Sequence, residues 1–339
     1  MRWVVAAPGP AFSVQDVYVG WCEALKELGQ HAIEYNLSER LTFYSSALKQ
    51  VSEHTFVPYL TGDQAYELAI NGLYATLYKA RPDVLLVISG FFVPPQLLDR
   101  ARRSGTRTVV AYTEVPYEND KQLKLAPYAD INLLDDPTGI EDYARHGKAV
   151  YVPHAYRPGL HTPGPAVPAL ECDLGFVGTG FPSRVEFFER MDLAGVDVLL
   201  AGNWTLVGED SPLAPYVVTH VDDCLDNVKT VQVYRSARVG LNLYRRESQR
   251  PELSQGWACS PREIEMAAVG LPFLRDPRPE GDELFPMLPT FTSPQEASEL
   301  LRWWLTHPDE RDKAAAGARE AVAERTFKHY AAQLLSMLE

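Results

Sequence analysis

Short apolar runs alternate with segments of helical periodicity along most of the chain. The clearest run, at 84–88, is closed by Ser89-Gly90 and followed by a helical pattern at 95–103. Strands that alternate with helices in this way predict parallel sheets covered on both faces. In the first half we expect strands at 1–7, 32–35, 84–88, 108–112, 131–134 and 149–152, helices at 13–28, 61–79 and 95–103, and two more helices that end near 129 and 146.

The alternation resumes after a stretch rich in proline and glycine at 153–168. Because 339 residues are long for one domain, this composition shift suggests a boundary. We predict an N-terminal domain at 1–155, a linker at 156–168, a C-terminal domain at 169–325 and a final helix at 326–339. In the second half we expect strands from 172 and at 198–201, 238–243 and 271–274, and helices at 185–191, 231–237, 262–269, 293–306, from 308 past 317, and at 327–338.

The stretch 257–276 organises the second half. Ser260 is suited to cap a helix, Pro261 to occupy its first position, and Glu263 to complete a capping box. The helix would run over 262–269 and stop at Gly270. A helix start of this kind offers free N–H groups and a partial positive charge to a phosphate.

Two acidic residues of this helix have alternative interpretations. Glu265 lies one turn inside the helix, where a carboxylate can accept hydrogen bonds from the two hydroxyls of a ribose. The other interpretation is an ordinary capped amphipathic helix on which Glu263 and Glu265 are solvated.

A glycine turn opens the second half. Gly178, Thr179 and Gly180 follow an apolar run, and Arg184 lies just beyond them. Small residues let the main chain approach a diphosphate, and an arginine can neutralise it. Arg245 follows the strand expected at 238–243, at the end where ligands bind in such sheets, although a surface or ion-pair role fits it equally well.

The spacing Arg262-x-x-Glu265-x-x-x-x-Gly270-x-Pro-Phe resembles the nucleotide-sugar site of GT-B glycosyltransferases, and is most similar to the branch around the spore-maturation protein CgeB. The family pattern Phe-Val-Gly followed by an arginine is also similar to 176–184. The resemblance implies an α/β chain with the GT-B fold: two Rossmann-like domains whose parallel sheets face each other across a cleft. It also implies that the final helix crosses back to the N-terminal domain.

The resemblance further implies transfer of a sugar from a nucleoside diphosphate sugar, with UDP- or GDP-sugar as the expected donor, to an acceptor hydroxyl. No metal and no tightly bound cofactor would be needed, because main-chain N–H groups and arginine stabilise the departing diphosphate. The phosphates are assigned to Gly178, Thr179, Arg184 and the helix start at 260–262, with Arg245 as a further contact, and the ribose to Glu265. The acceptor is a protein, a glycan or a small molecule, in a bacterium or a phage.

One departure from the family leaves the stereochemistry open. Many retaining members carry a second glutamate seven residues before the position of Glu265, where this chain has Trp257. The missing glutamate is absent or displaced to Glu252 or Glu247. An inverting enzyme would need a general base on the acceptor side.

Three residues of the first 155 are candidates for that base. Asp16 lies at the start of the helix expected at 13–28, Glu114 follows the strand expected at 108–112, and His154 follows the strand expected at 149–152. A structural role fits each of them as well. The adjacent pairs Asp135-Asp136 and Asp222-Asp223 are expected to be solvated turns, since neighbouring strand residues point to opposite faces and cannot share a metal ion.

Composition and charge exclude several classes of function. The formal net charge of −13 disfavours nucleic acid and anionic membranes as partners. The four cysteines are widely spaced, without a C-x-x-C pair, so we expect reduced thiols in a cytoplasmic protein. No apolar run is long enough for a membrane span, and the N-terminus lacks a signal-peptide pattern.

Two other functions compete with the transferase. The Gly-Thr-Gly turn at 178–180 nearly satisfies a dinucleotide-binding motif, with Asp197 about 20 residues on, which suggests an NAD-dependent oxidoreductase. However, the third glycine is missing, and Asp197 precedes a strand instead of ending one. A non-catalytic scaffold that binds a sugar nucleotide or a partner is the other alternative.

Overall fold

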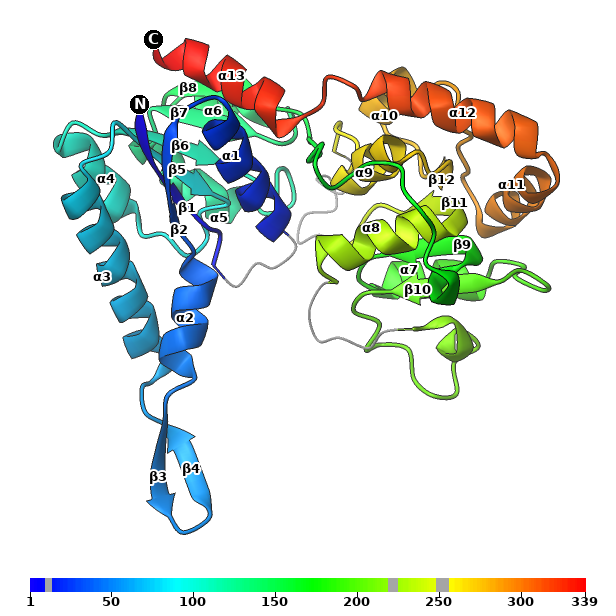
Figure 1. Cartoon of the computed structure of the whole chain (residues 1–339), viewed down its shortest axis with the longest axis horizontal. Coiled ribbons are helices and arrows are strands. Elements are labelled where there is room, and N and C mark those ends of the chain that lie inside the picture. Colours follow the sequence, from blue (N-terminus) through cyan, green and yellow to red (C-terminus); the bar gives the residue numbers. More distant parts are fainter. Residues whose placement is uncertain (10–13, 219–224, 248–255) are drawn as a thin grey trace. The chain divides into compact units, whose positions relative to one another are not determined.

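The computed structural model describes residues 1–9, 14–218, 225–247 and 256–339. The chain forms two compact units, drawn in Figure 1. Unit 1 contains 1–152 and 330–339, and unit 2 contains 153–329. The segment 156–168 therefore lies within unit 2, while most of the last helix belongs to unit 1.

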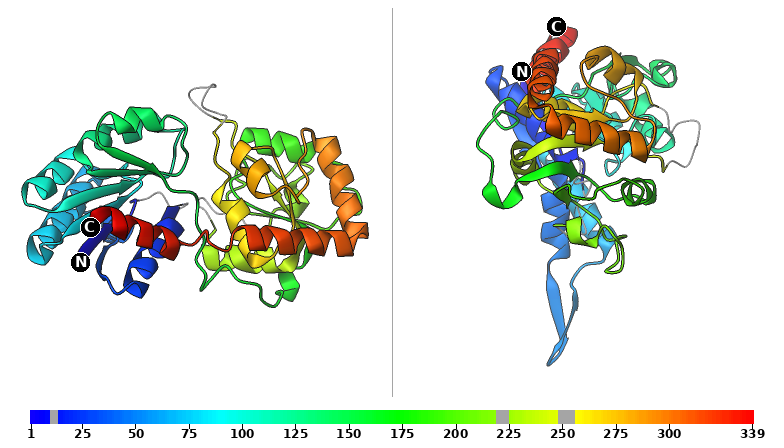
Figure 2. Two further views of the ribbon diagram at one scale, coloured as in Figure 1. Left: turned by 90° about the horizontal axis from the view of Figure 1, so that it is seen from above. Right: turned by 90° about the vertical axis from the view of Figure 1, so that its right-hand side faces the viewer.

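Unit 1 is built on a six-stranded sheet in the order β2-β1-β5-β6-β7-β8. Every neighbouring pair is parallel. All five residues of β5 are buried, because helices lie on both faces of the sheet (Figure 2). The strands are β1 Arg2–Ala6, β2 His31–Tyr35, β5 Val84–Ile88, β6 Arg107–Ala111, β7 Ile131–Leu134 and β8 Lys148–Tyr151.

The helices of unit 1 begin and end largely as local signals predict. Thr61 and Gln64 form a capping box at the start of α3. Helix α1 begins after Val14, which makes no side-chain cap, and Ser13, where the predicted helix starts, is outside the described residues. The helices are α1 Gln15–Glu27, α2 Leu37–Ser45, α3 Gly62–Ala80, α4 Pro95–Arg103, α5 Asn119–Gln122, α6 Ile140–Ala144 and α13 Phe327–Leu338, with a 3-10 turn at Leu123–Tyr128.

Helix α2 and the hairpin that follows it were not predicted from the sequence. Strands β3 (Leu48–Ser52) and β4 (Thr55–Pro58) form an antiparallel hairpin that is a separate two-stranded sheet. It follows α2 and projects away from the six-stranded sheet in Figures 1 and 2.

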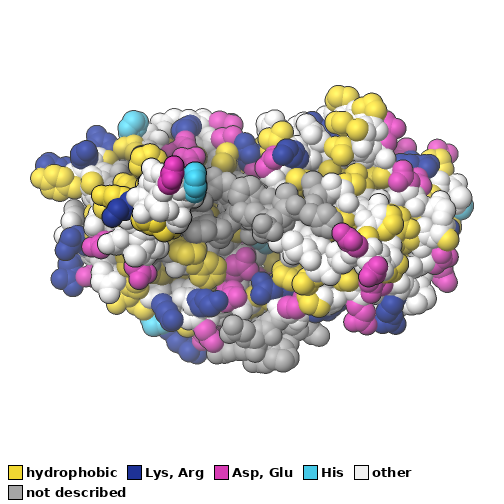
Figure 3. Space-filling view, turned by 90° about the horizontal axis from the view of Figure 1, so that it is seen from below, with side chains coloured by type: hydrophobic (Ala, Val, Ile, Leu, Met, Phe, Trp, Pro, Cys, Tyr) yellow, Lys and Arg dark blue, Asp and Glu magenta, His cyan; other side chains and the backbone are white. Residues whose placement is uncertain are grey.

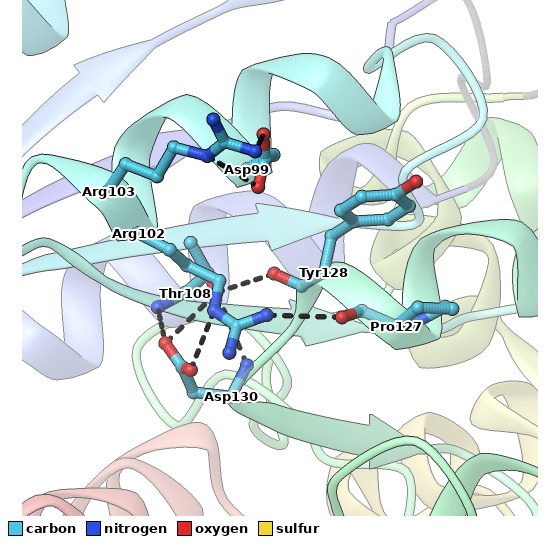
Figure 4. Close-up of polar contacts among 7 residues, drawn as sticks. All are labelled: Asp99, Arg102, Arg103, Thr108, Pro127, Tyr128 and Asp130. Atoms are coloured by element: carbon cyan, nitrogen blue, oxygen red, sulfur yellow. Dashed lines mark hydrogen bonds and ion pairs between the residues drawn. The ribbon is translucent and has the colours of Figure 1, made fainter.

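An ion pair and hydrogen bonds stabilise the unit 1 sheet at the amino-terminal ends of its strands, as Figure 4 shows. Arg102 on α4 contacts the Asp130 carboxylate at 3.0 Å and donates to the carbonyl of Pro127 at 3.1 Å. Asp130 in turn accepts from the N–H of Thr108 at 2.8 Å, at the start of β6. The edge is therefore held by charge-assisted hydrogen bonds that join a helix to two strands.

Unit 2 has a four-stranded parallel sheet in the order β10-β9-β11-β12. Its strands are β9 Cys172–Val177, β10 Val198–Ala201, β11 Ala237–Asn242 and β12 Phe273–Arg275. Its helices are α7 Pro182–Glu189, α8 Asn227–Ser236, α9 Pro261–Val269, α10 Pro279–Leu284, α11 Pro294–Thr306 and α12 Pro308–Ala321. Phe176, Phe188 and Trp204 meet edge to face in the core beneath the end of β9. In the described part of the chain, no helix has the length and apolar character that crossing a bilayer requires.

Arg235 on α8 holds the segment that precedes β9. Its guanidinium donates to the carbonyls of Leu160 at 3.1 Å and Thr162 at 2.8 Å, and to the Thr162 hydroxyl at 3.1 Å. The stretch predicted as a linker is thus anchored to the body of unit 2.

We expect Arg235→Ala to lower the free energy of unfolding by about 2 kcal/mol, because partly buried carbonyls lose their donors. Urea denaturation would measure the loss. Arg190→Ala is the matched control: its guanidinium is exposed and contacts only Glu186 among the described residues, at 3.3 Å, so its cost should stay within about 0.5 kcal/mol. Equal costs for the two variants would contradict the anchoring role.

Candidate functional site

The start of α9 has the predicted capping box. The Ser260 hydroxyl accepts from the N–H of Glu263, and the Glu263 carboxylate accepts from the N–H of Ser260 at 2.7 Å. Gly270 ends the helix with a φ of 86°. Since Pro261 has no N–H and the capping box uses two others, Arg262 carries the N–H that has no acceptor among the described residues.

Glu263 is fully buried, so the interpretation of a solvated Glu263 is wrong. It also accepts a hydrogen bond from the Tyr244 hydroxyl. Burial raises the pKa of Glu263, against the opposing effect of the hydrogen bonds from Tyr244 and Ser260. The carboxyl group therefore joins the end of β11 to the start of α9 from inside the core.

The Arg262 side chain crosses the carboxyl ends of two strands. Nε donates to the carbonyl of Val177 on β9 at 2.7 Å, and Nη1 donates to Oδ1 of Asn242 on β11 at 2.6 Å. The guanidinium also lies over the Phe176 ring, 5.0 Å from its centroid. All these partners are neutral, so within the described structure the Arg262 guanidinium is held in place without an ion pair to a carboxylate.

Asn242 is a buried hub for these contacts. Its Oδ1 also accepts from the Ser260 hydroxyl at 3.0 Å. The side chain is fully buried, and its Nδ2 makes no hydrogen bond within the described structure. Asn242 therefore has a structural role at the strand end, and its Nδ2 is an unsatisfied donor beside Arg262.

Two glycines bring main chain close to this arginine. A Cβ atom on Gly178 would lie 2.7 Å from Nη2 of Arg262, and one on Gly202 would lie 2.5 Å from the carbonyl oxygen of Gly178. Gly202 also has a φ of 109°, a left-handed conformation that favours glycine. Gly202 is therefore required where β10 ends, and a side chain at Gly178 would displace the Arg262 guanidinium.

Arg184 is buried under the glycine turn. It donates to the carbonyls of Thr179 at 2.9 Å and Leu243 at 2.7 Å, and it lies over the ring of Phe181 at 5.1 Å. These contacts join the turn after β9 to the end of β11. The sequence suggested direct neutralisation of a diphosphate, whereas these contacts hold the main chain that forms the turn.

Arg245 and Glu247 organise the loop after β11. The Arg245 guanidinium also lies over the Phe181 ring, 5.4 Å from its centroid, and its Nε donates to the carbonyl of Glu247 at 2.7 Å. The Glu247 carboxylate accepts from the N–H of Ser183 at 2.9 Å, in the first turn of α7. Partial burial acts to raise the pKa of Glu247, but the hydrogen bonds from Ser183 and from its own loop outweigh it and the pKa is lowered.

Glu247 therefore caps the start of α7, and its assignment as the displaced glutamate stays a prediction. Glu252, the other residue considered for that position, is outside the described residues. The loop before α9 is anchored by Glu280, whose N–H donates to the carbonyl of Trp257 and whose carboxylate accepts from the N–H of Cys259 at 2.8 Å. The Cys259 thiol is buried and burial raises its pKa, which agrees with a packing role and not with a nucleophile.

Glu265 has a neighbour that the sequence did not indicate. Nε2 of His161 lies 4.0 Å from Oε1 of Glu265. Nδ1 of His161 accepts from the N–H of Arg157 at 3.1 Å, so the neutral ring carries its proton on Nε2, facing Glu265. His161 belongs to the segment 156–168 that was predicted as a linker. It is too far in sequence from 257–276 for any local pattern to predict its contact with Glu265.

The three candidate bases belong to different parts of the chain. Asp16 is in the first turn of α1, Glu114 follows β6 in unit 1, and His154 belongs to unit 2 just after β8. Glu114 lies near Asp135, which follows β7 and accepts from the N–H of Val115 at 3.2 Å.

Asp135 is a further candidate that the sequence did not indicate. Its neighbour Asp136 is buried and accepts from the N–H of Thr138 at 2.7 Å, so the expected solvated turn at this pair is wrong. Loss of solvation, followed by the charges of Glu114 and Asp136, raises the pKa of Asp135 well above its usual range. A carboxyl group of this kind at a strand's carboxyl end is a candidate base. The second pair, Asp222-Asp223, is outside the described residues.

A groove at the opposite edge of the unit 1 sheet is a poorer candidate. It is lined by Asp99, Arg102, Arg103, Gly105, Thr106, Arg107 and Asp130. Two of its arginines are paired with carboxylates, as Arg102 is with Asp130 and Arg103 is with Asp99 in Figure 4. It also lies at the amino ends of the strands, away from the edge where open α/β sheets bind ligands.

Comparison with solved structures shows the fold of the whole chain. Sucrose-phosphate synthase from Thermosynechococcus elongatus aligns over 99% of this chain and 98% of its own, with a TM-score of 0.66 and 16% identity. The chain has the GT-B fold. A family model described as "Glycosyl transferase-like" matches residues 184–336, which include α7, β11 and α9.

Two further structures show how widely this fold is used. HepE from Anabaena, in complex with UDP-glucose, aligns with a TM-score of 0.63 over 99% of this chain and 100% of its own, at 12% identity. A candidate UDP-N-acetylglucosamine 2-epimerase from Listeria monocytogenes aligns with the same score over 99% of this chain and 95% of its own, at 13% identity. No curated protein sequence matches the chain.

We expect Glu263→Ala to destabilise the protein by about 3 kcal/mol, because the buried Tyr244 hydroxyl and Ser260 N–H lose their acceptor. Glu263→Gln retains an acceptor and should cost less. Urea denaturation would measure both. Glu186→Ala, at a side chain that is 70% exposed, should change little, and a comparable loss there would contradict this prediction.

We also expect Asp135→Asn to stabilise the protein at neutral pH. The native state holds the Asp135 proton more tightly than the unfolded chain does. The protonated carboxyl group therefore stabilises the fold at pH values below its ordinary pKa of about 4. This stabilisation is lost as the pH rises through the raised pKa of the native state. Asparagine retains an acceptor for Val115 without the charge.

Thermal denaturation across pH would therefore give equal midpoints for Asp135→Asn and the unmodified protein near pH ~4, and a higher midpoint for the variant as pH rises. Asp99→Asn, at an exposed ion pair, is the control and should show no such gain. A variant that loses stability at neutral pH would show that the charged carboxylate is favoured in the native state.

Proposed function

We propose that this protein is a glycosyltransferase that moves a sugar from a nucleoside diphosphate sugar to an acceptor hydroxyl. The observation that carries the proposal is the guanidinium of Arg262, held by the neutral groups of Val177 and Asn242 beside Gly178. An anion of high charge density fits a fixed cation next to exposed main chain. The family model that spans 184–336 supports transfer over other uses of the fold.

The donor diphosphate is assigned to Arg262, its own N–H, the unsatisfied Nδ2 of Asn242 and the main chain of Gly178 and Thr179. Ser260 and Pro261 shape this helix start, and Arg184 positions the turn from below. Arg245 contributes a second cation at the edge of the site. Glu265 accepts the ribose hydroxyls, and Nε2 of His161 lies 4.0 Å from its carboxylate.

In the proposed reaction, the bond between the anomeric carbon and the β-phosphate oxygen breaks, and the acceptor oxygen forms the new bond to that carbon. The leaving diphosphate takes the electron pair, and its growing charge is stabilised by Arg262 and the N–H groups without a metal ion. The acceptor proton passes to a base, for which Glu114 with its neighbour Asp135 is our first choice, ahead of Asp16 and His154.

We propose a UDP-sugar as the donor, ahead of a GDP-sugar, because HepE binds UDP-glucose on the same fold. The spacing of Arg262, Glu265 and Gly270 supports a place near the CgeB branch. The three described cysteines that are free support a reducing cytoplasm as the location. The acceptor is assigned as a hydroxyl of a glycan, a protein or a small molecule.

Calorimetric titration with UDP tests the site directly. We expect Arg262→Ala and Glu265→Ala each to weaken binding about 10- to 100-fold, the equivalent of about 1.4–2.8 kcal/mol for a lost charged hydrogen bond. Arg262→Lys should recover little, because a lysine cannot span Val177 and Asn242 at once. Arg190→Ala is the control and should bind normally.

If both alanine variants bound UDP with unchanged affinity, Arg262 and Glu265 would not be part of the nucleotide-binding site. Release of UDP from a UDP-sugar, measured with and without EDTA, tests turnover and metal independence. Binding without turnover in the presence of acceptors would favour the non-catalytic scaffold. Conversion of UDP-N-acetylglucosamine to its epimer would show that the protein is an epimerase and not a transferase. Binding of NAD without binding of UDP would instead indicate an oxidoreductase.

A further inference from the structure

The β3–β4 hairpin has no cover in the described structure. Every residue from 45 to 59 is exposed, on both faces of both strands. The hairpin pairs with no other strand among the described residues. A two-stranded hairpin without a packed face is only marginally stable in water. The described residues of the chain therefore supply no contact that would stabilise the hairpin.

The exposed apolar side chains of the protein are concentrated here. Of 14 large hydrophobic side chains exposed among the described residues, six fall within 43–59. We call these six the hairpin patch: Phe43, Leu48, Val51, Phe56, Val57 and Tyr59, with exposed fractions of 66%, 61%, 53%, 57%, 36% and 65%. Figure 3, seen from the end toward which the hairpin points, shows hydrophobic side chains at the surface of that part of the molecule. Exposed large hydrophobic side chains gathered in one short segment indicate an interaction surface.

The strand register divides the patch between two faces. Leu48 pairs with Pro58, and Gln50 pairs with Phe56, so Leu48 and Phe56 share one face of the hairpin. Lys49 pairs with Val57 on the other face. A face that carries a leucine and a phenylalanine in adjacent register positions can pack against a copy of itself.

Charge narrows the choice of partner. The chain carries a formal net charge of −13, so most surface contacts between two copies are repulsive. The hairpin segment 46–60 is an exception, because its only charged residues are Lys49 and Glu53. With a single lysine it offers no attraction to nucleic acid or to an anionic membrane, whereas its neutrality permits contact with a second copy.

We propose that the hairpin patch is the interface of a two-fold homodimer, in which the Leu48–Phe56 faces of two copies pack together and the other four patch side chains are also covered by the partner copy. The six side chains expose roughly 600 Å² per copy, counting about 150–250 Å² for a fully exposed large side chain. This approaches the ~800 Å² that each partner buries in a stable interface. Because the same surface meets itself, the contact closes at two copies.

The strand edges favour packing by faces over continuous pairing of strands. Pro58 has no N–H to donate from β4, and the register of β3 is shifted between Gln50 and Ser52. Such features prevent the edges of a hairpin from joining into open-ended sheets. The expected assembly is therefore a discrete dimer and not a fibre.

Sedimentation velocity of the full chain across a wide micromolar range tests the proposal. We expect a species of about twice the 37.9 kDa chain mass. The double variant Leu48→Asp/Phe56→Asp should be monomeric, because two new charges per copy face each other in the interface. Circular dichroism and the thermal midpoint of the variant verify that the sheet of unit 1, to which neither residue contributes, is still folded.

The matched control is Leu68→Asp/Tyr78→Asp, which places the same two charges on α3, where these side chains are 40% and 77% exposed. It should remain dimeric. Hydrogen exchange gives a second readout: amides at 48–58 should be protected in the unmodified protein and exchange rapidly in the Leu48→Asp/Phe56→Asp variant.

Three results would overturn the proposal. The unmodified protein could be monomeric throughout, the hairpin variant could remain dimeric, or the α3 control could dissociate as fully as the hairpin variant. A monomer that binds neutral vesicles or a polymeric acceptor, and loses that binding in the hairpin variant, would assign the patch to that other partner.

Discussion

The hydrogen bonds to the side-chain oxygen of Asn242 are the interactions on which the geometry of the candidate site depends. That one buried oxygen accepts from the Ser260 hydroxyl and from the guanidinium of Arg262, which also holds the carbonyl of Val177. It thereby joins the end of β11, the start of α9 and the end of β9. Without it, Arg262 would lose its direction and the helix start would lose its place against the sheet.

The chemical nature of the groups that hold Arg262 matters as much as their position. Several arginines of this chain face carboxylates, as Arg246 faces Asp276 and Arg325 faces Glu280. Arg262, by contrast, is held by a carbonyl and an amide, which fix its geometry without neutralising its charge. Since the chain is acidic overall, such a cation is the local feature that attracts an anion, and the fold has oriented it before any ligand arrives.

The buried contacts and the candidate functional groups lie in different places within each unit. In unit 2 the buried network around Glu263 holds the helix from inside, while the groups proposed to bind the donor lie at the ends of the strands. In unit 1 the sheet is complete without the β3–β4 hairpin, whose residues are exposed throughout. The hairpin can therefore serve an assembly contact without any change to β6 and β7, the strands that Glu114 and Asp135 follow.

The sequence by itself determined most of the elements and the helix start at 260, because periodicity, Ser260, Pro261, Glu263 and Gly270 act over a few residues. It did not determine the approach of His161 to Glu265, the burial of Asp136 or the neutral partners of Arg262. The contacts of Arg262 and His161 join segments that are distant in the chain, since Val177 and Arg262 are 85 positions apart, and only the packed sheet brings them together. The hairpin also escaped prediction, since its apolar side chains are not buried by this chain and leave no amphipathic pattern to detect.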